Sequence, residues 1–450
     1  MQRLTPYDHL VRMFETDTSP MNIAGLLVFD VPEGEGAGFA ARVRGVLEDR
    51  VPRTLLAQRQ IEAPDDFDAP AWFGIDPSAA IAQIRTCEFV EPLDRQGVID
   101  HVVRRSLEHI DIAKAAFAID IIGPVVGWGC AIYLKHHHSL TDGIGFQKVL
   151  AALTDEGAIG LGPLPQGAEE VPSDEAWRAA SRDRFEHEAS DREVEAQRKA
   201  AAQQAYVEFL ADPAHQRAEL PVPAFGSVTG PDRAYRPVSV ELERLRAIGR
   251  RLGGSVNDIF IAVVAGALRT YLLERDLLPE RPLIAQCVRS FRRPEHGDWG
   301  NRVNTMFPEI ATDEADPRAR LARIRANMTI EKRRAEIEEH FIDQFDAPYG
   351  ARDRKAALSD IAGKQAAIGQ SNIVLSNVPG PAEPPHLAGY RLIGNFPLPI
   401  LGPGLFLNIT LRRNGSSLDM GVMTDPAKIT DIDALTVAIE RALYELEKTK

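Results

Sequence analysis

The sequence predicts an α/β protein of two domains, in which mixed sheets are flanked by helices. Apolar runs that are typical of strands, such as Ile23–Phe29, alternate with amphipathic stretches that are typical of helices, such as Phe39–Arg50. At 450 residues the chain is too long for one ordinary core. A charged, linker-like stretch separates two such regions, so we expect an N-terminal half over residues 1–155, a linker with crossover helices over 156–230, and a C-terminal half over 231–450.

In the N-terminal half, proline at a helix start, helical spacing of apolar residues and short apolar runs predict the elements in order. Residues 62–80 are rich in proline and aspartate and predict loops. The expected elements are a short capped helix from Leu4–His9, a strand at Ile23–Phe29, a helix at Phe39–Arg50, a helix at Gly97–His109, and strands at Ala116–Ile122 and Trp128–Leu134.

A polar motif stands where the last of these strands ends. Residues 137–143 read His-His-Ser-Leu-Thr-Asp-Gly and lead into a predicted helix, Phe146–Leu153. The spacing sets an imidazole and a carboxylate, Asp142, four residues apart across a turn, and Gly143 and Gly145 relax its backbone. A histidine titrates near neutral pH and can take a proton from a hydroxyl. The motif therefore predicts an acid–base site suited to acyl transfer.

Two other interpretations of these histidines remain open. Adjacent residues on a strand alternate faces, so His136 and His138 can share a face while His137 points away. Three histidines and an aspartate could bind a metal, but neither His-Glu-x-x-His nor paired cysteines accompany them, so we expect none. The histidines could also serve only to satisfy hydrogen bonds of the loop.

The linker and the C-terminal half follow the same signals. Residues 157–172 are rich in glycine, proline and glutamate, and the charged, alanine-rich stretch Ser173–Leu210 predicts one or two surface helices. Later elements are expected as strands at Tyr235–Val240, Pro282–Val288, Ser371–Val378, Gly389–Leu398, Leu405–Leu411 and Ser417–Thr424, and as helices at Leu242–Leu252, Val256–Leu273, Arg318–Glu336, Lys355–Ile368 and Thr430–Lys448.

Two polar pairs in the C-terminal half are further candidates. Asn257 and Asp258 open an apolar helix, where helix capping explains them equally well as a site does. Ser376 and Asn377 end a β-branched run before a Pro-Gly turn. Either of the latter could donate a hydrogen bond to the oxyanion of a tetrahedral intermediate.

Composition excludes several classes of protein. A net charge of -13 argues against a broad nucleic-acid surface. The three cysteines, Cys87, Cys130 and Cys287, are far apart and odd in number, which fits a reducing cytoplasm without a disulfide framework. We see no signal peptide, and Ile259–Leu268 and the proline-broken run Phe396–Leu411 are too short to cross a bilayer. A lipid substrate would have to be approached from the water side.

The motifs of the chain resemble those of a known family. Residues 137–143 match the His-His-x-x-x-Asp-Gly signature of the CoA-dependent acyltransferase superfamily. Pro6–Asp8, the stretch from Pro20–Gly25 and the Ser-Asn-x-Pro-Gly-Pro of Ser376–Pro381 narrow the similarity to the bacterial wax ester synthase/diacylglycerol acyltransferase family, nearly end to end. The resemblance implies a chloramphenicol-acetyltransferase-like fold of two α/β halves with a tunnel at the domain interface.

The resemblance also implies an activity. It predicts an O-acyltransferase that moves a long-chain acyl group from acyl-CoA to a fatty alcohol or to diacylglycerol, giving a wax ester or triacylglycerol. No cofactor or metal is expected, because acyl-CoA is a substrate. The partners expected are acyl-CoA and a lipid or alcohol acceptor, with contact to a membrane or lipid droplet from a cytoplasmic location.

The resemblance assigns roles to individual residues. His138 is the expected general base, and His137 is expected to be structural or tuning. Asp142 is expected to form a buried ion pair with Arg292 that holds the loop. The residues expected to bind substrate or stabilise the oxyanion are Asn257, Ser376, Asn377 and Gly143, and Asp258 is expected to give structural support.

Departures from the family pattern leave the acceptor open. The family's Pro-Leu-Trp element is replaced by Lys114–Phe117, and Val288 and Arg289 stand in place of its Pro-Val. One alternative is a related or condensation-type enzyme with another acceptor or a carrier-bound donor, against which the missing carrier domain counts. Another is a non-catalytic lipid-binding protein, against which the intact motifs count.

Overall fold

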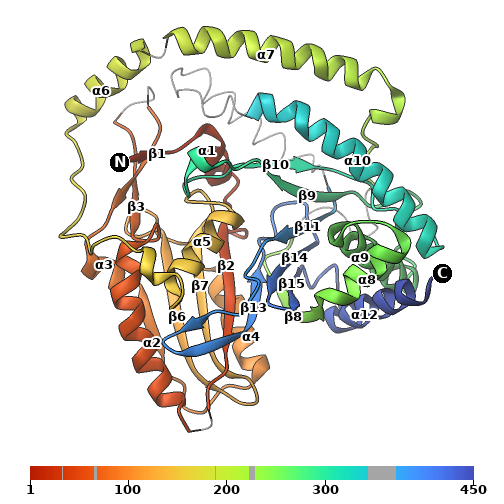
Figure 1. Ribbon diagram of the computed structural model, residues 1–450, viewed down its shortest axis with the longest axis horizontal. Coiled ribbons are helices and arrows are strands. Elements are labelled where there is room, and N and C mark those ends of the chain that lie inside the picture. The colour runs from red at the N-terminus through yellow and green to blue at the C-terminus, as the bar shows by residue number, and fades with distance from the viewer. Residues whose placement is uncertain (33, 65–67, 188, 222–228, 343–370) are drawn as a thin grey trace.

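The computed structural model describes all residues except 33, 65–67, 188, 222–228 and 343–370. Two six-stranded sheets, each flanked by helices, lie side by side, one built largely from the first part of the chain and one from the last (Figure 1). Both sheets mix parallel and antiparallel neighbours. Ile84–Cys87 runs parallel to Phe117–Val125 in one sheet, and Ile373–Val378 runs parallel to Ala285–Ser290 and Leu407–Asn414 in the other. The mixed α/β class predicted from the sequence is confirmed.

The N-terminal sheet carries the histidine motif near its centre. In spatial order its strands are β12 (His386–Leu387), β13 (Tyr390–Leu398), β2 (Asn22–Phe29), β7 (Gly129–His137), β6 (Phe117–Val125) and β5 (Ile84–Cys87). The helices of this half are α1 (Pro6–Met13), α2 (Gly36–Arg50), α3 (Pro77–Ile81), α4 (Arg95–Leu107) and α5 (Gly143–Leu153). Apolar residues of β7, α2 and α5, among them Leu134, Val43 and Phe146, share one core.

The C-terminal sheet and its helices enclose a second core. In spatial order its strands are β10 (Val303–Met306), β9 (Ala285–Ser290), β11 (Ile373–Val378), β14 (Leu407–Asn414), β15 (Ser417–Thr424) and β8 (Ala234–Glu241). The helices are α8 (Leu242–Leu252), α9 (Val256–Leu273), α10 (Pro317–Ile342) and α12 (Ile432–Lys448). Helix α9 is surrounded by α8, α10 and α12, which explains its nearly uninterrupted apolar sequence (Figure 1).

Two strands, β12 and β13, cross between the halves. β13 belongs to the predicted C-terminal half, yet it pairs with β2 of the other sheet, with Phe396 opposite Leu26 and Leu398 opposite Ala24. The contiguous division at 1–155 and 231–450 therefore does not describe the sheets. Pairing between segments this far apart depends on tertiary contacts, which local sequence patterns do not contain.

The stretch expected to be loop-rich is more ordered than its composition indicates. Residues 62–80 contain β4 (Ala71–Gly74) and the start of α3, and β4 lies between β1 (Gln2–Arg3) and β3 (Gln58–Ile61) in a small sheet. Aromatic residues inside the run, Trp72 and Phe73, are buried and account for the strand. The helix predicted at Lys355–Ile368 lies outside the described residues.

The linker forms a helical arm. Helices α6 (Asp174–His187) and α7 (Ala189–Leu210) run over one side of the molecule, and α7 packs against α10 (Figure 1). Trp177 anchors α6: it is buried, and its Nε1 donates to Asp68 Oδ2 at 2.8 Å. The predicted surface helices are thus present, fixed by few buried side chains.

Among the residues that the structure describes, one helix is long and apolar enough to cross a membrane by length and composition. It is α9, and 72% of its apolar window is buried inside the protein. The helix predicted at Val256–Leu273 has these bounds, although its uninterrupted apolar run was counted only as Ile259–Leu268. Its burial among α8, α10 and α12 is what a core helix requires.

Candidate active site

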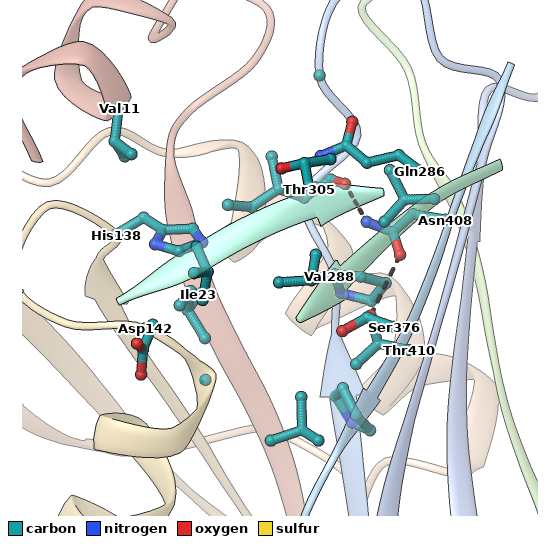
Figure 2. Close-up of a pocket in the computed structure, with 18 of the residues that line it drawn as sticks. Val11, Ile23, His138, Asp142, Gln286, Val288, Thr305, Ser376, Asn408 and Thr410 are labelled. Carbon is teal, nitrogen blue, oxygen red and sulfur yellow. Dashed lines mark hydrogen bonds between the residues drawn. The ribbon is translucent and has the colours of Figure 1, made fainter. Parts of the chain in front are cut away.

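A cavity of about 620 Å³ lies between the two sheets. One wall comes from α1, β2 and the histidine loop, and the other from β9, β10, β11 and β14. Figure 2 shows Val11, Ile23, His138 and Asp142 on one side, facing Gln286, Val288, Thr305, Ser376, Asn408 and Thr410 on the other.

His138 is the histidine of the motif that lines this cavity. It lies one residue beyond the end of β7, its backbone N–H donates to the Met21 carbonyl at 2.7 Å, and its carbonyl accepts from Asn301 Nδ2 at 2.8 Å. Loss of bulk water around the ring is the largest influence and lowers the pKa of His138 below 6.5, although Asp142 partly opposes it. The imidazole is therefore neutral at physiological pH and can accept a proton.

Two residues outside the motif fix this backbone. The Asn301 backbone N–H and Nδ2 both donate to Asp8 Oδ1, at 2.7 and 2.8 Å, and Asp8 Oδ2 in turn caps α1 through Thr5. Gly300 has a φ of +65°, and a Cβ there would lie 2.7 Å from Asp8 Oδ2. Within its own helix, Asp8 is the carboxylate of a capping box with Thr5. Its second role requires a contact across 293 positions of the chain, which the local pattern does not contain.

The other two histidines are buried and differ in role. His137 Nδ1 accepts from the Ser139 backbone N–H at 3.2 Å, and its Nε2 lies 3.5 Å from Glu15 Oε2. Burial alone would raise the pKa of Glu15, but hydrogen bonding and attraction to His137 outweigh it and lower that pKa. His136 packs on Phe146, with ring centroids 4.8 Å apart, and burial lowers its pKa to about 3. Neither residue lines the cavity among the positions described.

Both carboxylate oxygens of Asp142 are occupied. Oδ1 caps α5 by accepting from the N–H groups of Ile144 and Gly145, at 3.0 and 2.9 Å. Oδ2 accepts from Arg292 Nη2 at 2.8 Å and from the Arg302 N–H at 3.0 Å. The Asp142 and Arg292 side chains are only 1% and 4% exposed, so the predicted buried ion pair is present. It holds the motif turn against the C-terminal half and leaves Asp142 no free lone pair directed at His138.

The remaining candidates divide into two groups. Gly143, Ser376 and Asn377 line the cavity, and Ser376 faces it from β11 across from His138 (Figure 2). Asn257 and Asp258 are not among the described residues that line it. Asp258 completes a capping box with Ser255 at the start of α9, and its Oδ2 accepts from the Ser255 backbone N–H at 2.8 Å. Asn257, which was expected to bind substrate or stabilise the oxyanion, thus lies in the capped first turn of α9 and not in the cavity wall.

Sequence reasoning missed a polar face on the C-terminal sheet. Alternate residues of neighbouring strands point into the cavity, and register sets Ser376 opposite Thr410 and Val374 opposite Asn408. The polar residues of this face are Gln286, Ser290, Ser376, Asn408, Thr410 and Arg412. A period-two polar pattern in Asn408–Arg412 was the available signal, but the run was taken only as a strand.

A cysteine, a histidine and an aspartate meet on the other face of the N-terminal sheet. One possible ligand atom each from Cys87, His101 and Asp120 lies within 4.8 Å of the others. Asp120 already pairs with Arg105 Nε at 2.6 Å and with Arg85 Nη2 at 3.1 Å. Burial, and then the Asp120 carboxylate, raises the pKa of the Cys87 thiol to about 11. A cation would meet two guanidinium groups and a protonated thiol, so these residues fit an ion-pair network better than a metal.

Comparison with protein families decides the relationship. Residues 4–260 match the wax ester synthase/diacylglycerol acyltransferase catalytic domain, and residues 299–447 match the C-terminal domain of the same family. The catalytic-domain match alone spans more than half of the chain. The chain belongs to the wax ester synthase/diacylglycerol acyltransferase family. It is an acyltransferase of this family, and the family predicted from the motifs is confirmed.

Individual relatives align with this chain over nearly their full lengths. A candidate diacylglycerol O-acyltransferase of Mycobacterium bovis is 28% identical over 465 residues, covering 100% of this chain and 99% of the relative. The O-acyltransferase WSD of Acinetobacter baylyi is 24% identical, covering 99% and 97%. The structure of the wax ester synthase/diacylglycerol acyltransferase of Marinobacter aquaeolei VT8 aligns with a TM-score of 0.67 at 24% identity, covering 99% of both chains.

The fold of this family is shared more widely. The first condensation domain of the CDA synthetase aligns with a TM-score of 0.58 at 15% identity, covering 100% of this chain and 96% of that domain. Such a likeness shows the two-domain fold alone. In this wax ester synthase/diacylglycerol acyltransferase family member, the cavity between the two sheets occupies the interface at which the resemblance predicted a tunnel.

Proposed function

We propose that the protein transfers a long-chain acyl group from acyl-CoA to the hydroxyl group of a second substrate, with His138 as general base. The observation that carries this proposal is a neutral imidazole facing a cavity lined by both sheets. The nearby carboxylate of Asp142 is committed to Arg292 and to the cap of α5. Asp142 therefore holds the loop, and proton transfer falls to His138.

The reaction follows from these positions. His138 takes the proton of the acceptor hydroxyl while the oxygen attacks the thioester carbon. The Ser376 hydroxyl supports the resulting oxyanion, with Asn377 as the alternative donor. The carbon–sulfur bond then breaks, and the CoA thiolate takes the proton from His138. A positioned base contributes roughly 10²–10⁴-fold and one oxyanion donor roughly 10²–10³-fold. This scheme uses no cofactor, no metal and no nucleophile of the protein.

Diacylglycerol and fatty alcohols are the proposed acceptors, because the names of the relatives specify a diacylglycerol O-acyltransferase and a wax ester synthase. The unusual segment Lys114–Phe117 is not among the described residues that line the cavity. Lys114 is exposed and pairs with Asp111, and Ala116 is buried. We also propose a cytoplasmic location with peripheral contact to membranes or lipid droplets, since diacylglycerol and long-chain alcohols partition into lipid.

The test is thiol release from palmitoyl-CoA by the purified protein. It is run without acceptor, with a long-chain alcohol and with diacylglycerol, each beside His138→Ala. We expect release that depends on one acceptor and that falls at least ~10²-fold in the variant. His187→Ala is the matched control, because His187 lies exposed on α6.

Normal turnover by folded His138→Ala would contradict the proposal. Release that no acceptor stimulates, in a protein that is otherwise folded, would instead indicate a carrier-bound donor or another acceptor. Chromatography of the product identifies the ester formed and so distinguishes a wax ester from triacylglycerol.

A further inference from the structure

A buried guanidinium lines the cavity on its polar face. Arg412 lies on β14, two residues beyond Thr410, and register sets it opposite Val378 on β11 and Asp419 on β15. Its side chain is among the largest that are fully buried, yet it borders the same cavity as His138. None of the roles assigned to the cavity above uses it.

Arg412 has few partners for a buried cation. Its Nη1 donates to Asn395 Oδ1 at 2.9 Å, and its Nε makes no hydrogen bond with any residue that the structure describes. The buried carboxylate of Asp419 attracts Arg412 but forms no ion pair with it in the described part of the chain. Its Oδ1 accepts from the hydroxyls of Ser239 and Ser417, and its Oδ2 accepts from the Asn395 N–H. Burial lowers the pKa of Arg412 to about 10, so it remains charged at neutral pH. A buried cation with spare donors is costly unless an anion completes it.

Gly25 makes room for this guanidinium. A Cβ on Gly25 would lie 3.2 Å from Arg412 Nη1, and the Phe146 ring centroid lies 5.3 Å from the guanidinium carbon. On this side the guanidinium meets a glycine and the face of an aromatic ring, and neither supplies an anion. Because Gly25 has no side chain, the guanidinium can lie between the two sheets.

The site lies at a distance from the proposed base. Gly25 is four residues along the chain from Met21, whose carbonyl accepts the His138 N–H. At ~3.3 Å per strand residue this is a separation of about 13 Å along β2. The wall between them is apolar, with Val11, Ile23 and Ala24 lining the cavity. A medium-length aliphatic chain reacting at His138 can therefore reach Arg412 with its far end.

We propose that Arg412 binds a carboxylate at the far end of a substrate chain, so that the protein prefers chains ending in an acid over chains ending in a methyl group. The inference rests on the proposed acyl transfer. The acid could belong to the acceptor, as in an ω-hydroxy fatty acid, or to the donor, as in the CoA monothioester of a dicarboxylic acid. In either case the carboxylate accepts charge-assisted hydrogen bonds from the Arg412 guanidinium.

The experiment compares kcat/KM within two matched pairs. The acceptor pair is decanol and ω-hydroxydecanoic acid, each with palmitoyl-CoA. The donor pair is decanoyl-CoA and sebacoyl-CoA, each with decanol. In one pair we expect the wild type to favour the acid by roughly tenfold to a hundredfold, the range typical of a hydrogen bond to a charged group. The pair that shows the preference identifies the source of the carboxylate.

Variants then assign the preference to Arg412. Arg412→Gln should abolish it, so that the acid-ended and methyl-ended members of the pair react with similar kcat/KM, and Arg412→Lys should keep part of it. Arg413→Gln is the control, because Arg413 is the next residue on β14, does not line the described cavity and donates to the Gly415 carbonyl. It should keep the wild-type preference.

Two results would overturn the inference. One is that, in both pairs, the wild-type kcat/KM for the acid-ended member is no higher than that for the methyl-ended member. The other is an Arg412→Gln variant that lowers both members equally, since Arg412 would then serve only to join β14 to Asn395. If Arg412→Gln does not fold, the inference is judged from two results: whether the wild type prefers the acid-ended member, and whether Arg412→Lys reduces that preference.

Failure of the proposed function is recognised separately. If no pair gives His138-dependent thiol release, the same four ligands are titrated by calorimetry into wild-type and Arg412→Lys protein. Tighter binding of the acid-ended member of a pair, weakened in the variant, supports the inference without turnover. Equal binding within both pairs refutes it.

Discussion

At the scale of single residues, the proposed base is positioned through its backbone. The Met21 carbonyl and the Asn301 side chain hold the main chain of His138 from two sides. The ring is thereby left to the cavity. Asp142 lies four residues from His138 in the motif. Its Oδ1 accepts hydrogen bonds at the start of α5, and its Oδ2 accepts one from Arg292. A motif can name the residues of a site, but only tertiary contacts show which one holds and which one reacts.

The substitution Asp142→Asn should therefore destabilise the protein by about 3–5 kcal/mol, because it leaves the buried Arg292 guanidinium without its carboxylate. Urea unfolding followed by circular dichroism measures this change. Asp298→Asn is the matched control, since Asp298 pairs with Lys148 on the surface, where each side chain is half exposed. It should cost less than ~1 kcal/mol. Equal costs for the two variants would contradict a structural role of the Asp142–Arg292 pair.

At the scale of elements, local patterns predicted what local physics determines. Helices α8 and α9 begin and end where their apolar spacing, the Gly253-Gly254-Ser255 break and the Ser255 cap indicate. The strand β4 was missed because flanking aspartates and prolines outweighed a short aromatic run. The alternating polar residues of β14, Asn408, Thr410 and Arg412, fit any half-buried strand, so their pattern alone does not show that this face lines a cavity.

Strand β11 supplies the clearest prediction at this scale. Ser376 and Asn377 both border the cavity, but as neighbours on a strand they point to opposite faces, and Ser376 faces His138 across the cavity (Figure 2). Ser376→Ala should lower kcat by roughly 10²-fold with KM little changed, as expected for loss of one oxyanion donor. Asn377→Ala should lower kcat by less than about tenfold. A larger effect of Asn377→Ala under the same steady-state assay would assign the donor to Asn377.

At the scale of the whole molecule, the two sheets depend on each other. β13 reaches from the C-terminal part of the chain to complete the N-terminal sheet beside β2, and its neighbours on the other side include β14 and β15. The Asp142–Arg292 pair and the Asp8–Asn301 contacts cross the same interface. The order of elements along the chain predicted two halves, but not that one half completes the other.

We therefore expect the protein to unfold in a single cooperative transition. Differential scanning calorimetry measures this directly, through agreement between the calorimetric and van't Hoff enthalpies. Two resolved transitions, each with its own enthalpy, would show that the halves fold independently and that β13 contributes little to the N-terminal sheet.

The central claim is that a neutral His138 takes the acceptor proton, and the pH dependence of kcat/KM tests it most directly. Burial lowers the pKa of His138, so the base stays unprotonated to a pH below its ordinary value of 6.5. We expect kcat/KM to be constant near neutral pH and to fall tenfold per pH unit only below a midpoint under 6.5. A midpoint at or above 6.5, or a profile that His138→Ala leaves unchanged in shape, would contradict the claim.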